Sequence, residues 1–227
     1  MQYLSRLFTV LFIALILSGC NNEQPVSSEL TEVEPASLAK RFERAEVMAF
    51  QPAGALGGGV LAPGTFFPPT DGGTSILHRG NDWISYNIHT TGLPAGAYTN
   101  WWIIFNNPED CTDDCGEDDI FSPETKANPS VFWATGGIVQ EDGVGNFRAR
   151  IREGQPSNGP DGFLIGNGLE DAANAEVHLI IKYHGPASDD PDVLFDQTHT
   201  LLGSCDSGAN AAANGQCFDP QAVAHRR

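Results

Sequence analysis

Histidines are the side chains of this sequence whose type and spacing most favour metal chemistry. His178 and His184 lie on one side of the alternating stretch 175–184, and His225 lies further along the chain. An open zinc or copper site needs about three such ligands. Residues six apart on a strand are separated by roughly 20 Å, so one ion joins His178 to His184 only if the strand bends. The interpretation we favour is that these are surface or hydrogen-bonded structural histidines.

A second metal candidate is the acidic loop Cys111–Asp119, which has five carboxylates within seven residues. Calcium takes about six to eight oxygen ligands in a flexible cage, and such a loop could supply several of them. The loop lacks the Asp-x-Asp-x-Asp-Gly spacing of an EF-hand. We therefore expect a solvated acidic loop and no cofactor. The alternatives are calcium bound by this loop, and copper or zinc bound by the histidines.

Motifs of catalytic nucleophiles are absent from the sequence. It has no Gly-x-Ser-x-Gly, no phosphate-binding loop and no His-Glu-x-x-His. A pair of carboxylates can hydrolyse a glycoside, but only where both flank the same glycosidic bond. The sequence therefore favours a protein that is not an enzyme, and hydrolysis of envelope glycans stays a second alternative.

The first twenty residues have the features of an export signal. Arg6 supplies a positive charge, and Leu7–Leu17 is an apolar run of eleven residues, whereas spanning a bilayer takes about twenty. The run ends in Leu17-Ser18-Gly19-Cys20, which resembles the lipobox of bacterial lipoproteins. That resemblance implies removal of residues 1–19, acylation of Cys20 with palmitate and membrane anchoring; an ordinary secretory signal is the alternative. An Asp after the Cys resembles an inner-membrane retention signal, and Asn21 stands there instead, so the outer membrane is favoured if the host has one.

Residues 20–45 are predicted to be a tether between the anchor and a single domain over residues 46–227. The tether is rich in Asn, Glu, Ser and Pro as far as about residue 37, with too little apolar surface to offset the entropy of ordering. Beyond it, Leu38, Phe42 and Ala45 have helical spacing, which allows a short amphipathic helix over Ser37–Val47.

Four cysteines remain when Cys20 is assigned to the lipid: Cys111, Cys115, Cys205 and Cys217. Their spacing does not resemble a zinc ribbon, and an exported protein meets an oxidising compartment, so two disulfides are expected. Three pairings are possible. We favour 111–115 with 205–217, because each of these bridges closes a short loop, and no cysteine is then left for catalysis.

Charge restricts the partners of the domain. The chain has 12 basic and 29 acidic residues. Removal of Arg6 with the signal leaves 11 basic residues and a balance of −18. Such a charge favours solubility, is compatible with divalent cations, and opposes binding to nucleic acid or to an anionic lipid surface.

Short alternating runs separated by Gly, Pro, Asn and Asp predict an all-β domain. The expected strands are residues 59–67, 74–79, 83–91, 98–106, 131–140, 146–153, 175–184 and 193–201. In the third, Ile84, Tyr86 and Ile88 oppose Ser85, Asn87 and His89; in the sixth, Phe147, Ala149 and Ile151 oppose Arg148, Arg150 and Arg152. Eight such strands favour a single β-sandwich of Greek-key type, or a barrel, with long loops.

The strand over residues 98–106 departs from this alternation, because it is apolar on both faces around Trp101 and Trp102. A strand with one solvated face does not have this pattern. Either the long loop 107–129 covers its second face, which we favour, or an exposed tryptophan face is a platform for a ligand.

Thr91-Gly92-Leu93-Pro94-Ala95-Gly96-Ala97-Tyr98 resembles the Gly-Leu-x-Pro-Gly turn of copper/zinc superoxide dismutases and CHRD domains. The resemblance covers about eight residues and implies a sandwich. In those families a strand with His-x-His follows, whereas Thr99 and Asn100 follow here, so the resemblance does not extend to dismutase activity. Other stretches, among them Trp101-Trp102-x-x-Phe105 and the segment Cys217–His225, resemble secreted bacterial proteins without a known function.

The leading hypothesis is therefore a lipid-anchored, non-catalytic binding or structural module of the cell envelope, whose partner is an envelope protein or a glycan. The alternative is a metal-binding sandwich that uses surface histidines and acidic residues.

Overall fold

The computed structural model describes residues 42–49, 69–112, 114–122, 124–203, 205 and 217–226, with the backbone alone at 48–49 and 69–72. All of them belong to one compact unit within residues 34–227. The export signal, Cys20, the tether up to residue 41 and the expected strand 59–67 lie outside the described residues. These four features stay predictions.

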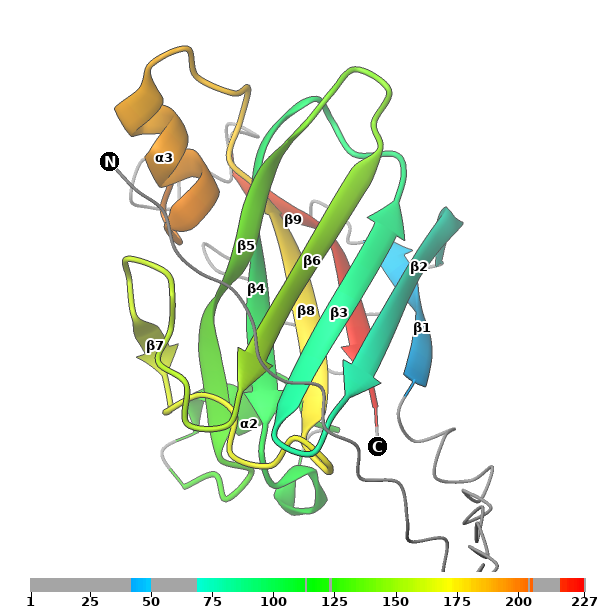
Figure 1. The fold of residues 1–227 in the computed structure, drawn as a ribbon, viewed down its shortest axis with the longest axis vertical. Helices are drawn as coiled ribbons and strands as arrows, with labels where there is room; N and C mark the ends of the chain where they lie inside the picture. The colour runs from blue at the N-terminus through cyan, green and yellow to red at the C-terminus, as the bar shows by residue number, and fades with distance from the viewer. Residues whose placement is uncertain are drawn as a thin grey trace, which may run out of the picture. The chain divides into compact units, whose positions relative to one another are not determined.

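Nine strands, two α-helices and one 3-10 helix make up the described part of the chain (Figure 1). Their bounds are β1 Phe42–Ala49, β2 Pro69–Arg79, β3 Trp83–Thr90, β4 Gly96–Phe105, η1 Pro108–Asp110, α2 Glu117–Phe121, β5 Pro129–Val139, β6 Gly145–Arg152, β7 Phe163–Ile165, β8 Glu176–Tyr183, α3 Pro191–His199 and β9 Phe218–His225. Among the described residues, no helix is long and apolar enough to cross a membrane.

The strands form one antiparallel ladder in the order β6-β3-β2-β1-β9-β8-β4-β5-β7. The ladder folds over where β1 pairs with β9, through Met48–Ala222 and Ala49–Gln221. As a result, β6, β3, β2 and β1 form a front layer, and β9, β8, β4, β5 and β7 form a back layer (Figure 1). Their side chains meet between the layers, so the fold is the all-β sandwich that the sequence predicts.

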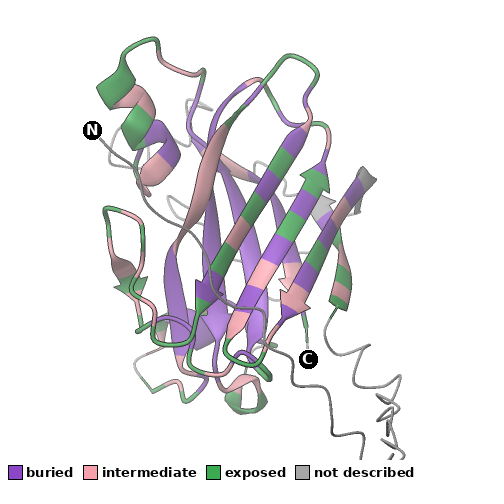
Figure 2. Cartoon of the chain, viewed as in Figure 1, coloured by how far each residue is buried: buried purple, intermediate pink, exposed green. Residues whose placement is uncertain are grey.

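The inner core fills the space between the layers and explains the alternation of the front strands. Tyr86 and Ile88 of β3 pack there with Phe147 of β6 and with Leu179 and Ile181 of β8. Buried and solvated residues alternate along β3 and β6, whereas β4 and β8 are buried throughout their lengths (Figure 2). The predicted inward and outward faces of β3 and β6 are therefore confirmed.

A second apolar cluster, the outer cluster, lies on the far side of the back layer. Trp101 and Ile103 of β4 pack there with Cys115, Ile120 and Ala127 from the segment between β4 and β5. This segment is the loop that the sequence predicted as a cover. Because both faces of β4 are covered, its sequence has no solvated alternation.

The expected helix over Ser37–Val47 is wrong for the residues that are described, since Phe42–Ala49 is strand β1. Phe42, Arg44 and Glu46 are exposed, while Glu43 and Ala45 are half-buried and Val47 is buried. This is the period of a strand with one covered face. The folded part consequently begins before residue 46, the boundary drawn from the sequence.

The expected strand 193–201 is also wrong, because Pro191–His199 is helix α3. The Asp190 side chain accepts hydrogen bonds from the backbone N–H groups of Asp192 and Val193, at 2.9 and 3.4 Å. Pro191 occupies the first turn, where its missing N–H has no consequence. An N-cap Asp followed by Pro is a helix-start signal that outweighs the short apolar run.

Strands β7 and β9 were not predicted. β9 contains Pro220, which normally argues against a central strand, yet it lies between β1 and β8. The β8–β9 pairing has an irregular register between Ile181 and Tyr183. The proline lies beside this irregularity, where it removes no regular ladder hydrogen bond.

Candidate functional site

The outer side of the front layer carries four of the six exposed Lys and Arg residues in the described part of the chain. We call this surface the arginine face. It consists of the outward side chains of four adjacent strands: Phe42, Arg44 and Glu46 of β1; Thr74, Ile76 and His78 of β2; Trp83, Ser85, Asn87 and His89 of β3; and Asn146, Arg148, Arg150 and Arg152 of β6. It forms because alternate residues of a strand point to one side, and the other side of these strands is the inner core.

Strand register arranges the arginine face into rows. Asn87 stands opposite Arg148, and Ser85 stands opposite Arg150. Alternate residues along one strand are roughly 6.6 Å apart, and neighbouring strands are about 4.8 Å apart. The face is therefore a lattice of guanidinium, amide and hydroxyl groups at regular spacing.

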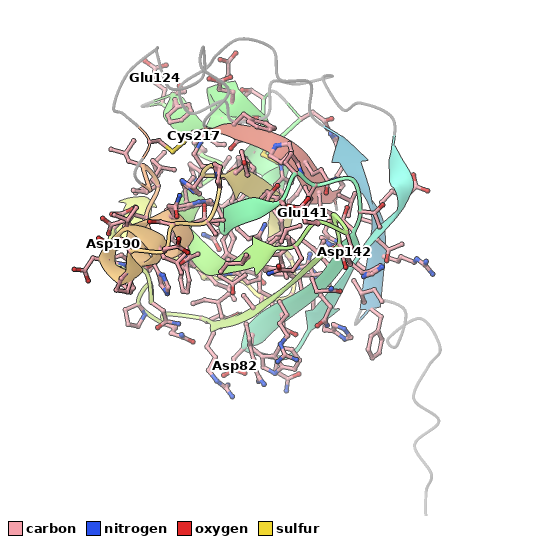
Figure 3. The ribbon with its side chains drawn as sticks, turned by 90° about the horizontal axis from the view of Figure 1, so that it is seen from above. Asp82, Glu124, Glu141, Asp142, Asp190 and Cys217 are labelled. Atoms are coloured by element: carbon pink, nitrogen blue, oxygen red, sulfur yellow. A yellow bond between two sulfur atoms is a disulfide. The ribbon has the colours of Figure 1, made fainter. Side chains whose placement is uncertain are left out.

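Contacts within the arginine face hold several of these groups in place. The guanidinium carbon of Arg150 lies 4.0 Å from the centre of the Trp83 ring, a cation–π contact. His89 Nδ1 lies 2.9 Å from Asn146 Oδ1. Arg152 donates to Asp82 at 2.7 Å, and Asp82 lies at the turn between β2 and β3, where Figure 3 labels it.

Two shallow depressions lie on or beside this surface. The first is lined by Phe42, His78, Arg79, Gly80, Asn81, Asp82 and Trp83. The second is lined by Thr74, Ile76, Asn87, Ile88, His89, Asn146, Phe147 and Arg148. Asp82 is the one carboxylate among these residues, so neither depression has the carboxylate pair that a glycoside hydrolase needs.

The ligand platform considered for Trp101 and Trp102 is not present, because the two side chains are 2% and 1% exposed. They point to opposite sides of β4, Trp101 into the outer cluster and Trp102 into the inner core. The Trp101 indole N–H donates to Thr99 Oγ1 at 2.7 Å. Both tryptophans are structural residues, and the covering loop is the correct alternative.

His178 and His225 are buried hydrogen-bonded residues rather than surface groups. His178 Nε2 lies 2.6 Å from Glu176 Oε1 on the outer side of β8, whereas His225 Nε2 lies 2.8 Å from Ser75 Oγ. Their exposed fractions are 2% each. Burial, followed by the positive charge of Arg79 and the neighbouring His178, lowers the pKa of His225 from 6.5 to about 3.

His184 lies in a different place, beside the second disulfide. Both sequential disulfides are present, Cys111–Cys115 and Cys205–Cys217, so the predicted pairing is confirmed. His184 Nδ1 is 3.3 Å from Cys205 Sγ, and its Nε2 is 2.7 Å from Thr99 Oγ1. Figure 3 labels Cys217 near the sulfur atoms.

A polar pair lies on the same side of the sheet as His184. Lys182 Nζ donates to Asp219 Oδ1 at 3.2 Å. Burial raises the pKa of Asp219, and the charge and hydrogen bond of Lys182 partly offset this rise. Burial, followed by the charge of Lys182, lowers the pKa of His184 from 6.5 to about 3.

The three histidines therefore do not form the metal site considered from the sequence. Among the described residues, one group of three or more His, Cys, Asp or Glu side chains has ligand atoms close enough for a single ion: His184, Cys205 and Cys217. From their spacing, the two cysteines were expected to have a structural role only. Their proximity to His184 depends on how α3 and the following turn return to β8, which no local pattern specifies.

The acidic loop is partly folded onto itself. Asp119 is 1% exposed, and its Oδ1 accepts from the backbone N–H and the hydroxyl of Thr112 at 2.7 and 2.8 Å. Asp114 forms an ion pair with Arg226. Asp113 lies outside the described residues, and calcium binding by this loop stays a prediction.

Comparison of the chain with protein-family models, with curated proteins and with solved structures gives no match.

Proposed function

We propose that this protein is a non-catalytic binding module of the cell envelope, anchored through a lipid on Cys20, whose arginine face binds an anionic glycan. The concentration of arginine on this face is the observation that carries the proposal. Four of the 11 basic residues expected in the mature chain, Arg44, Arg148, Arg150 and Arg152, lie there.

Charge complementarity supports an anionic ligand. The whole chain is strongly acidic, yet among the described residues Glu46 of β1 is the one carboxylate on the face itself. Asp82, at the turn beside the face, is paired with Arg152. Charges in solution are screened beyond about 8 Å at physiological ionic strength. A bound anion therefore interacts mainly with the arginines under it rather than with the distant acidic residues.

The shape of the face favours an extended polymer over a small molecule. It is an open sheet face whose two depressions are not enclosed, whereas small ligands are usually bound in clefts that bury most of their surface. Arg148 and Arg150 are exposed and lie about 6.6 Å apart along β6. Asn87, Asn146 and Ser85 beside them offer amide and hydroxyl groups for sugar hydroxyls.

Other macromolecules fit this face less well. The core of a protein–protein interface is largely apolar, although Arg is enriched there, whereas on this face polar and charged side chains outnumber the apolar Phe42, Ile76 and Trp83. Nucleic acid has about one charge per 1.7 Å of duplex, which maximises repulsion from a chain with a balance of −18. A polyuronate is a single strand with one carboxylate per sugar, so its charge density is below that of a nucleic-acid duplex and it meets less of this repulsion.

The test is binding of the purified mature protein to alginate, a linear polyuronate, with dextran as the neutral polymer. We expect binding to alginate and not to dextran. Replacement Arg148→Gln removes one exposed charge from the face and is expected to weaken binding about fivefold, as for the loss of roughly 1 kcal/mol. Lys126→Gln is the matched control, because Lys126 is exposed on the loop between β4 and β5. No binding to alginate, or equal loss in both variants, would overturn the proposal.

Anchoring is tested separately in the full chain, expressed in a bacterium that processes lipoproteins. Wild type is expected to incorporate labelled palmitate and to fractionate with membranes. Cys20→Ala is expected to lose both properties while its soluble domain keeps its binding to alginate. Incorporation of label by Cys20→Ala would contradict the anchor and leave the arginine face unaffected.

A further inference from the structure

The Cys205–Cys217 disulfide and His184 form a cluster that the binding function does not use. The three ligand atoms, one imidazole nitrogen and two sulfurs, all lie within 4.8 Å of one another. Zinc binds sulfur at about 2.3 Å and nitrogen at about 2.0 Å, so the ligands of a tetrahedral site stand roughly 3.3–3.8 Å apart. The 3.3 Å between His184 Nδ1 and Cys205 Sγ already has this separation.

The groups around His184 hold its ring in one orientation, as the hydrogen-bond partners of metal-binding histidines do. His184 is 3% exposed, and its Nε2 is 2.7 Å from Thr99 Oγ1, which also accepts the Trp101 indole N–H. A hydroxyl oxygen has two lone pairs, so Thr99 can accept from both rings. With its proton on Nε2, His184 directs the lone pair of Nδ1 towards Cys205, the arrangement in which a hydrogen-bond acceptor orients a metal-binding histidine.

The backbone on the other side of the imidazole is also fixed. Gly203 has φ +39, and a Cβ added there would collide with His184 Nδ1 and its ring. Only a residue without a side chain brings the chain this close to the histidine. Cys205 follows two residues later and is half-buried, whereas Cys217 is buried, so Cys205 is the more exposed residue of the pair.

We propose that Cys205, Cys217 and His184 form a redox-controlled zinc site. While the two sulfurs are bonded to each other, neither is a thiolate, and the thiolate is the form that binds metal. A dithiol reductant supplies two electrons and two protons; its own thiols join as a disulfide, and Cys205 and Cys217 become thiols. A zinc ion then displaces both thiol protons and is held by two thiolates and His184 Nδ1.

Charge balance favours this assembly inside the protein. Two thiolates balance the charge of Zn²⁺ and the imidazole is neutral, so the site has no net charge to desolvate. Three protein ligands leave a fourth position for water or an external ligand. Cys205 and Cys217 therefore cross-link the chain as a disulfide when oxidised, and they bind a metal together with His184 when reduced.

The test uses the chain without its signal and with Cys20→Ala, Cys111→Ser and Cys115→Ser, which leaves Cys205 and Cys217 as its two cysteines. The protein is reduced with a phosphine, which takes its oxygen from water, and is titrated with Co²⁺ and with Zn²⁺. We expect one ion per chain, a thiolate-to-cobalt charge-transfer band and the visible spectrum of tetrahedral cobalt. The oxidised protein is expected to show none of these.

Variants separate the ligands from general damage. Cys205→Ser is expected to remove most of the charge-transfer band, and His184→Asn to lower zinc affinity at least tenfold. Thr99→Val, which removes the group that orients His184, is expected to lower it about tenfold to a hundredfold. Near-ultraviolet circular dichroism monitors folding of each variant and of the reduced protein.

Two results would overturn the proposal. One is a folded, reduced protein that binds no stoichiometric zinc, or that binds it equally well when oxidised. The other is a reduced protein that has lost its tertiary structure and does not recover it when zinc is added. Neither result bears on the arginine face, which is tested with the oxidised protein.

Discussion

His225 Nε2 lies 2.8 Å from Ser75 Oγ, so a hydrogen bond joins strands β9 and β2 across 150 residues of sequence. A serine hydroxyl at this distance from an imidazole also occurs in nucleophilic enzymes. Here Ser75 is 0% and His225 is 2% exposed, and no substrate reaches them. The Ser75–His225 hydrogen bond therefore stabilises the fold. The other ring nitrogen, His225 Nδ1, is the one buried side-chain nitrogen or oxygen among the described residues without a hydrogen-bond partner. A proton added to this nitrogen would be buried without an acceptor, so the folded protein disfavours the protonated ring.

The first prediction is that His225 makes stability depend on pH. Its pKa is lowered to about 3 by burial, then by Arg79 and His178, while the unfolded chain retains a pKa near 6.5. Between these values the unfolded chain binds more protons. Stability is therefore complete above pH 6.5 and decreases as the pH falls towards 3, by about 1.4 kcal/mol per pH unit.

The variant His225→Asn isolates this effect from the rest of the protein. His184 has a pKa lowered in the same way, and the raised pKa of Asp219 acts in the opposite direction; both are kept in the variant. Urea unfolding at several pH values should give a flatter dependence for His225→Asn below pH 6.5, whatever its stability at neutral pH. Parallel pH dependences for the two proteins would contradict the assignment.

The second prediction concerns the buried ion pair between Arg79 of β2 and Glu43 of β1. Arg79 Nε donates to Glu43 Oε1 at 2.6 Å, and a second nitrogen donates to Oε2 at 3.0 Å. The Arg79 side chain is 3% exposed, so removing its partner leaves a buried charge. Glu43→Gln is expected to lower the free energy of unfolding by about 3 kcal/mol.

Asp82→Asn is the matched control for this prediction. The Asp82–Arg152 pair has a similar distance, 2.7 Å, but both side chains are more than half exposed. Exposed pairs contribute about 1 kcal/mol or less, so urea unfolding should show a small change. Equal losses in the two variants would mean that burial does not decide the strength of these pairs.

The third prediction concerns two adjacent glycines of β5. A Cβ at Gly136 would collide with the backbone carbonyl of Thr198 in α3, whereas a Cβ at Gly137 meets nothing within 4 Å. Gly136→Ala is therefore expected to push α3 away from the sheet and to destabilise the protein by about 1–3 kcal/mol. Gly137→Ala should be neutral or slightly stabilising.

Hydrogen exchange distinguishes these two glycine variants locally. Gly136→Ala should speed exchange at the amides of α3, and Gly137→Ala should leave them unchanged. Faster exchange in both variants would mean that the strand itself, rather than the contact with Thr198, is sensitive to a side chain.

The sequence predicted most of the strands, because one covered face produces a visible alternation. β3 and β6 are the clearest examples, with Ile84 and Phe147 turned inward and Asn87 and Arg148 outward. It failed where local signals compete: Phe42 and Ala45 have helical spacing but lie in β1. In α3 the capping pair Asp190-Pro191 decides, although an apolar run suggests a strand.

The candidate sites were harder to predict, because both depend on contacts between distant segments. The alternation of Arg148, Arg150 and Arg152 was visible, but their neighbours Trp83 and Asn87 became known only with the β3–β6 register. His184 was considered from the sequence as a metal ligand together with His178 and His225, whereas in the structure it lies beside Cys205 and Cys217. His184 contacts Cys205 because the backbone at Gly203 passes directly against the His184 ring. No spacing rule connects His184 with Cys205 in the sequence.

The last prediction is that binding to alginate depends on salt through the arginines of β6. Arg148 and Arg150 are exposed, so their attraction to an anionic polymer is screened as ionic strength rises; the Debye length falls from about 10 Å at 0.1 M to about 3 Å at 1 M. Affinity should therefore decrease steadily between these concentrations. In Arg148→Gln the decrease should be shallower, because one charge no longer takes part, while Lys126→Gln should keep the slope of wild type. If binding persists unchanged at 1 M salt, the contact is with the sugar rings at Trp83 rather than with their anionic groups, and Trp83→Ala rather than Arg148→Gln would then abolish it.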